Sequence, residues 1–291
     1  MVMENLIRLC KKLHSNEQKF RAPWCTEMTE LSNTSQRTKQ IAFLTIFTAL
    51  YIILRFIPFS VIIGTTGAFL SLSDFLAPLI GIILGPYVGG LTVIIGNLAA
   101  IGLGRPMSFF GLDFLPDLMA VLATGFLMQR KRSSWAIVVG FNAALLVIFL
   151  LNPLTSVFVF SFPFVWLHIV AFIVLLSPLS LMAAKWLCTI DIKKIAGGIF
   201  VLAFIGVMMQ HLTGSILFEV ILNQVTNSVP AASYGPTWTA VFFVYPVERA
   251  ILIASAVIVG TPLIYLLNKV PFLNPRTIMC PKPPETRQPK E

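Results

Sequence analysis

The chain has 291 residues, of which 57% are hydrophobic and 11% charged, and its formal net charge is +9. A soluble chain of this length would suggest two domains, but this composition excludes a soluble protein. Uncharged runs of roughly 20 residues, enough to cross the hydrocarbon core of a bilayer, recur along the chain. The sequence therefore predicts an all-α fold, a polytopic membrane helical bundle.

The first segment, residues 1–39, is polar and carries seven Lys or Arg residues. It has no apolar h-region, so we expect no cleavable signal peptide and predict a basic cytoplasmic segment. Residues 3–13 have apolar side chains at helical spacing, which fits either a short interfacial helix or a disordered tail.

Residues 40–268 form the predicted transmembrane domain, with about eight helices. A Pro- and Lys-rich cytoplasmic tail, residues 269–291, follows and is expected to be disordered. We expect a break in the sixth helix at Pro163 or Pro178, since proline interrupts helices. The expected helices are about 40–58, 74–86, 88–103, 112–129, 134–152, 157–187, 195–223 and 237–268.

The second and third of these helices should fold back on each other through the turn GPYVGG. Gly81, Gly85 and Gly89 recur every four residues, which places them on one helix face. Because glycine lets backbones approach closely, we expect the other helices to pack around this segment.

The basic residues indicate the orientation of the bundle. With both termini inside, 18 of the 21 Lys and Arg residues fall in cytoplasmic segments, and the exceptions are Arg55, Arg105 and Arg249. This bias agrees with eight spans under the positive-inside rule. We therefore interpret the basic surplus as a topology signal of a multi-pass membrane protein, not as a nucleic-acid site.

The four cysteines, Cys10, Cys25, Cys188 and Cys280, are scattered and lack metal-ligand spacing. All four fall on the predicted cytoplasmic side, so we expect them to be reduced thiols. No sequence feature predicts a metal or a cofactor.

Three acidic residues near predicted helix starts have two interpretations each. Asp74 is either the N-cap of the helix 74–86 or a ligand contact. Asp113 and Asp117 lie one turn apart at the outer start of the expected helix 112–129, where carboxylates suit the helix dipole. They could also bind a cation, but no further oxygen ligands lie nearby in the sequence, and we predict no metal site.

The helix 195–223 carries His211, Ser215 and Glu219 at positions i, i+4 and i+8, which predicts a polar stripe on one face. By helical rise, His211 lies in the outer half of the membrane and Glu219 near the outer surface.

The last helix carries an aromatic stripe, Trp238, Phe242 and Tyr245, that ends in Arg249 at mid-membrane. Aromatic and polar groups arranged in this way predict a small-molecule pocket that opens outward. The alternative is an ion pair between helices, for example Arg249 with Glu219. No nucleophile elbow, phosphate loop or histidine pair for zinc is present, so we do not expect an enzyme.

Three segments carry a resemblance to a known family: IAFLTIFTALYIILRFIP, LSLSDFLAPLIGIILGPYVGGLTVIIGNL and FFGLDFLPDLMAVLATGFL. The region that contains them, about 41–132, resembles the substrate-binding membrane subunit, or S component, of energy-coupling factor (ECF) transporters. The match includes a Ser/Asp turn before the second helix and a GP pair that closes it, at Ser73, Asp74, Gly85 and Pro86.

The resemblance implies a vitamin-like ligand on the outer side, a transmembrane coupling subunit and two ATPases that drive release by toppling the S component. It also implies docking through small residues of the first helix, here Ala42, Thr45 and Ala49. Since the family usually has six spans, eight would include two extra. Either the helices 134–152 and 157–187 include an insertion, or the last two helices match the family's final pair and the extra helices are in the middle. We expect the second arrangement.

Two other functions compete with this one. An ion-coupled secondary carrier would use Asp117, Glu219, Glu248 and Arg249 as a relay, although the sequence lacks a clear inverted repeat. A structural subunit of a larger membrane complex would use the same polar groups only to pair with one another.

Overall fold

The computed structural model describes residues 23–65, 67, 69–156, 158–270 and 280. Within this part the chain forms a bundle of eight α-helices, which confirms the predicted all-α membrane fold. The helices are α2 (Pro23–Arg55), α3 (Leu76–Gly102), α4 (Leu115–Met128), α5 (Arg132–Leu151), α6 (Trp166–Leu176), α7 (Leu179–Trp186), α8 (Ile192–Glu219) and α9 (Tyr234–Lys269).

Short elements connect these helices at one end of the bundle. The antiparallel pair β1 (Pro58–Val61) and β2 (Phe69–Ser71) joins α2 to the 3-10 helix η1 (Leu72–Phe75), with Pro58 opposite Ser71. A smaller pair, β3 (Phe158–Val159) and β4 (Phe162–Pro163), follows α5. The π-helix η2 (Val220–Val225) and the 3-10 helix η3 (Ala231–Ser233) join α8 to α9.

Helix lengths give fewer spans than the eight expected segments. Among the described residues, five helices are long and apolar enough to cross a membrane, or six if α6 and α7 count as one bent span. α6 and α7 meet at an angle of 72° beside Pro178, one of the two expected break points. α4, with 14 residues, is shorter than a full span.

α3 contains both helices that we expected between residues 74 and 103, and it folds back on itself at Gly85. That residue has φ 78° and ψ −179°, a conformation outside the helical region that glycine tolerates. A Cβ on Gly89 would lie 3.3 Å from the carbonyl oxygen of Ile80, whereas nine residues of a straight helix span about 13.5 Å. The predicted fold-back is therefore present.

The two arms of α3 pack against α4 through glycine. A Cβ on Gly81 would lie 2.1 Å from Thr124 Oγ1 and 2.4 Å from the carbonyl oxygen of Val121. A Cβ on Gly89 would lie 2.9 Å from the side chain of Val121. These contacts confirm the expectation that small residues in α3 form a packing surface for a neighbouring helix.

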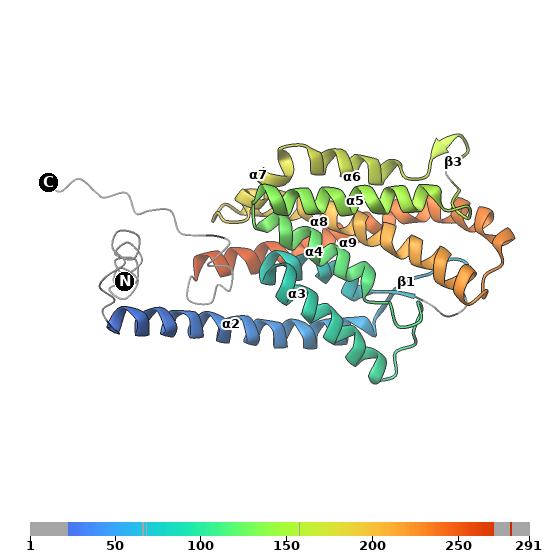
Figure 1. Cartoon of the computed structure of the whole chain (residues 1–291). Coiled ribbons are helices and arrows are strands. Elements are labelled where there is room, and N and C mark those ends of the chain that lie inside the picture. Colours follow the sequence, from blue (N-terminus) through green and yellow to red (C-terminus); the bar gives the residue numbers. More distant parts are fainter. Residues whose placement is uncertain (1–22, 66, 68, 157, 271–279, 281–291) are drawn as a thin grey trace.

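The connections alternate between the two ends of the bundle (Figure 1). The start of α2, the end of α9 and the α4–α5 and α7–α8 turns lie at one end, while both strand pairs and the α8–α9 connection lie at the other. The charge count places the first end in the cytoplasm, and this orientation stays a prediction.

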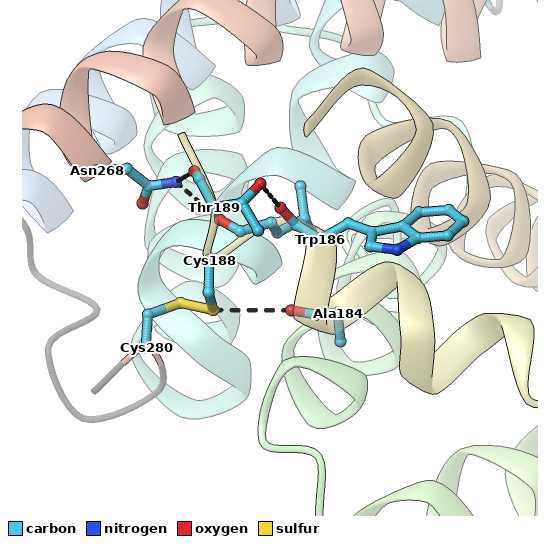
Figure 2. The surroundings of a disulfide bond; sticks show 7 residues. Ala184, Trp186, Cys188, Thr189, Asn268 and Cys280 are labelled. Atoms are coloured by element: carbon cyan, nitrogen blue, oxygen red, sulfur yellow. Dashed lines mark hydrogen bonds between the residues drawn. A yellow bond between two sulfur atoms is a disulfide. The ribbon is translucent and has the colours of Figure 1, made fainter. Parts of the chain in front are cut away.

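One cysteine prediction is wrong. Cys188 and Cys280 form a disulfide, although they are 92 residues apart in the sequence (Figure 2). Their Cα atoms lie 5.4 Å apart, within the normal range for a disulfide, and the linear spacing gave no sign of this contact. Nearby, Asn268 donates to the carbonyl oxygens of Leu187 and Thr189, which connects the end of α9 to the α7–α8 turn.

Two predictions concern residues that the structure does not describe: the possible interfacial helix at 3–13 and the disorder of the tail at 271–279 and 281–291. α2 is helical from Pro23, so it begins inside the segment that we predicted to be a cytoplasmic tail.

Candidate functional site

A pocket lies between α4, α8 and α9 and is closed by the end of α2, the β1–β2 pair, η1 and the loop before α4. These elements meet at the end of the bundle opposite the start of α2 (Figure 1). It contains about 880 Å³ of empty space, counting the part that opens to solvent. Its apolar wall includes Phe109, Phe218 and Trp238. Besides His211, its ionisable lining consists of three arginines and four carboxylates: Arg55, Arg105, Arg249, Asp74, Asp113, Asp117 and Glu248.

Arg55, at the end of α2, is neutralised by two buried carboxylates. Its Nη1 lies 3.4 Å from Asp74 Oδ1 and 3.4 Å from Asp117 Oδ2. Its Nε donates to Asn97 Oδ1 at 3.0 Å, and its Nη2 donates to the carbonyl oxygen of Asp113 at 2.9 Å. A buried arginine in a membrane protein needs several such partners, because a charged side chain without them would have a high free-energy cost. Arg55 therefore connects α2, η1, α3 and the start of α4.

Asp117 is the second centre of this network. Its carboxylate accepts hydrogen bonds from the hydroxyl of Tyr51 and from the side-chain amide of Gln210. Tyr51 reaches it because α2 approaches α3 at Gly96, where a Cβ would lie 2.7 Å from the Tyr51 ring. Asp117 thus joins α2, α4 and α8 and uses both its oxygens on protein groups.

The other predicted carboxylates also have protein partners. Asp113 accepts from the backbone N–H groups of Ser108 and Phe109, at 2.8 and 3.1 Å, and so closes the loop before α4. Asp74 is not an N-cap, because it lies at the third position of η1 and its carboxylate points to Arg55 and Ser71. The described residues contain no group of three or more His, Cys, Asp or Glu side chains able to hold a metal ion.

Arg249 is paired within α9. Its Nη2 lies 3.4 Å from Glu248 Oε2, and Ser60 in β1 donates to the other Glu248 oxygen. The alternative of an ion pair between Arg249 and Glu219 is not what the structure shows, because Glu219 is fully buried and accepts a hydrogen bond from Thr155 at 2.7 Å. Through Ser60, Glu248 holds the β1–β2 pair against α9.

Arg105 follows α3 and has weaker partners. Its Nη2 lies 3.5 Å from the carbonyl oxygen of Phe69, and its guanidinium lies 5.3 Å from the centre of the Phe69 ring. Burial, and next the positive charge of Arg55, lower the pKa of the Arg105 guanidinium below its usual value. Arg105 is therefore a poorly compensated cation on the pocket wall.

Two histidines and a tyrosine stack beside the pocket. The Nε2 atom of His168 lies 3.0 Å from Nδ1 of His211, and both rings stack on Tyr245. The Tyr245 hydroxyl donates to the carbonyl oxygen of Phe164 at 3.0 Å, which fixes the ring. Of the three, His211 lines the pocket.

The structure brings together most of the predicted site residues. Six of them line the pocket: His211, Ser215, Trp238, Arg249, Asp74 and Asp117. Glu219 and Tyr245 lie outside the lining and are fully buried. The proposed relay of Asp117, Glu219, Glu248 and Arg249 is therefore not continuous, since Glu219 lies away from the other three.

Among the lining residues that the prediction did not include are three polar ones that bond to other parts of the wall, Arg55, Arg105 and Gln210. Two of these had a signal in the sequence, because Arg55 and Arg105 were exceptions to the cytoplasmic placement of basic residues. The third exception, Arg249, also lines the pocket. Basic residues that break the orientation rule therefore mark this site.

The predicted docking residues lie away from the pocket on α2. Ala42, Thr45 and Ala49 are all exposed, and Thr45 donates to the carbonyl oxygen of Ile41 at 3.0 Å. Only 17% of the span 37–55 is buried inside the bundle. This face of α2 is thus free to contact lipid or another protein.

The fold and the site define a multi-pass membrane protein with a pocket for a small molecule. Residues 39–222 match the family model described as the ECF transporter, substrate-specific component, and the chain belongs to this family. The family consists of membrane components for substrate-specific transport, whose role is to bind the substrate. The match runs through α5, α6 and α7 and ends before α9, so it does not support the expectation that the extra helices are in the middle.

The chain is also 30% identical over 212 residues to an uncharacterized protein of Methanocaldococcus jannaschii. That alignment covers 72% of this chain and 66% of the relative, just under two thirds of the relative's length. No solved structure matches the chain.

Proposed function

We propose that the protein is the substrate-binding subunit of an ATP-driven ECF-type importer for a vitamin-like small molecule in a prokaryotic plasma membrane. The observation that carries the proposal is a largely apolar pocket, with a few placed charged groups, in a member of this transporter family. Such a pocket is the usual form of a small-molecule site. The pocket lies at the end of the bundle that the charge count places outside, where an importer must bind its substrate.

The energy for transport would come from partner proteins, a transmembrane coupling subunit and two ATPases. We propose that the coupling subunit contacts α2 through Ala42, Thr45 and Ala49. Small side chains permit close helix approach, and these three are exposed. In this proposal the pocket and the docking face are separate, so substitutions can affect one and not the other.

Substitution on the docking face tests the proposal. Thr45→Trp or Ala49→Trp should abolish co-purification with co-expressed coupling and ATPase subunits, because a bulky ring prevents close helix contact. The variants should keep their substrate affinity and thermal stability, since both positions are exposed. Gly102→Trp is a matched control, because this α3 position is exposed and a Cβ there would meet no atom within 4 Å.

Uptake measurements distinguish the competing functions. Proteoliposomes that contain the full complex should accumulate substrate only with ATP. Uptake by this chain alone, driven by an ion gradient, would contradict the proposal and favour a secondary carrier. Unchanged partner recovery in both Trp variants would show that this face contacts lipid.

A further inference from the structure

Three buried polar atoms of the pocket lining lack a hydrogen-bond partner among the described residues. They are Nε of Arg105, Nε of Arg249 and Oε1 of Gln210. The side chains are well buried, because Arg105 is 5% exposed and the other two are each 3% exposed. Buried polar groups in proteins are nearly always paired, so these atoms indicate where a bound molecule would make its contacts. Two of the three are donors with positive charge, and the third is an acceptor.

The three arginines differ in how far the protein already compensates their charge. Arg55 has two carboxylates at 3.4 Å, and Arg249 has one. None of the ion pairs between described residues includes Arg105. Asp113, the acidic residue close by in the loop, uses both carboxylate oxygens on backbone N–H groups. Arg105 is therefore the cation of the pocket that needs an anion from elsewhere.

The charges that line the pocket favour a ligand with one negative charge over a ligand with several. Its lining has four carboxylates and three arginines, so it already carries one excess negative charge if all are ionised. Asp74 and Asp113 line the same pocket as Arg105, so their carboxylates would repel a second negative charge on the ligand. A phosphate monoester, which carries close to two charges, fits this setting less well than a carboxylate.

The rest of the pocket wall is apolar, so a ligand that fills the pocket needs an apolar body. Phe109, Phe218, Trp238 and Val241 are among the apolar side chains that line the pocket beside the charged groups. The stacked imidazole of His211 adds a flat surface beside them. Burial of an apolar or aromatic group against this wall would supply most of the binding free energy, while the polar contacts would fix its orientation.

We propose that the substrate is a small monocarboxylate with an apolar body, whose carboxylate binds Arg105. A hydrogen-bond acceptor on the same molecule binds Nε of Arg249, and a donor binds Oε1 of Gln210. This inference rests on the proposed function, because it assumes that the pocket holds the transported molecule, and it adds the chemical class of that molecule.

Equilibrium dialysis of the purified full chain tests this assignment. The probe is an equimolar mixture of aromatic and aliphatic monocarboxylates, the primary amide of each, phosphate monoesters and amines, with the bound fraction read by mass spectrometry. We expect the chain to retain a monocarboxylate at least about 10-fold more tightly than its amide, since a contact with a charged group has this magnitude. In Arg105→Gln the acid should lose this advantage and bind about as weakly as the amide.

Two further variants keep the test decisive. Arg105→Lys keeps the charge and should keep part of the acid preference even if Arg105→Gln folds poorly. Lys193→Gln, an exposed change at the opposite end of the bundle, should leave the preference unchanged. Retention of mainly neutral molecules, amines or phosphate esters would overturn the substrate class, as would an acid preference that survives Arg105→Gln. Retention of nothing by the wild type would instead count against the proposed binding function itself.

Discussion

Replacing Arg55 by Gln should destabilise the bundle strongly. The change removes a cation that lies 3.4 Å from both Asp74 and Asp117 and donates to Asn97 and to the carbonyl oxygen of Asp113. Both carboxylates are buried, at 4% and 1% exposure, so each would lose its compensating cation in a setting that water does not reach. Breaking a buried ion pair in this way costs about 3–5 kcal/mol, and here one substitution removes the cation from two carboxylates.

The free energy of unfolding, measured by SDS titration in mixed micelles, should therefore fall by at least about 3 kcal/mol. Adding Asp74→Asn should recover part of this loss, because it removes one of the two unpaired charges, and a double-mutant cycle measures that coupling. Arg132→Gln, an exposed change at the other end of the bundle, is the matched control and should have little effect. A loss below about 0.5 kcal/mol in Arg55→Gln would refute the view that this network holds the helices together.

Three further predictions follow from other contacts. Gly81→Ala should lower stability by about 1–3 kcal/mol or more, because its Cβ would overlap α4, whereas Gly102→Ala should be nearly neutral in the same unfolding assay. Arg249→Gln should lower the melting temperature, because Glu248 loses the cation with which it forms an ion pair. A second change, Glu248→Gln, should restore the melting temperature. If the double variant stays as unstable as the single one, this pairing is contradicted. The topology can be tested by labelling single cysteines in a variant without native cysteines. A cysteine in the α8–α9 connection should be labelled only from outside, and a cysteine in the α4–α5 turn only from inside. The reverse pattern would contradict the topology. The labelling sites are two exposed serines, Ser228 and Ser133.

Several features of the fold could be predicted from the sequence because they depend on local properties of the chain. Long apolar runs predict membrane helices, since backbone groups in lipid must be satisfied within the segment. Gly85 and Pro178 mark real breaks, because the preference of each residue for a non-helical or restricted conformation is local. The spacing of His211 and Ser215 predicts that they share a face of one helix, and both lie in the lining of the pocket.

Helical spacing was less reliable over longer distances. Glu219 follows His211 by eight residues, which corresponds to a rotation of roughly 80° around the helix axis. It therefore turns away from the pocket toward Thr155. Tyr245 shares the face of Trp238, but its hydroxyl bonds to Phe164 and its ring is covered by the two histidines.

Only the tertiary structure decided which charged groups pair. Arg55 finds its carboxylates 19 and 62 residues away, and the disulfide joins cysteines 92 residues apart. The sequence identified the buried arginines as exceptions but could not show that Arg55 is neutralised while Arg105 is not. The physical reason is that helical periodicity fixes which side chains share a face of one helix, whereas the partner across the interface depends on how each helix is rotated and shifted against its neighbours.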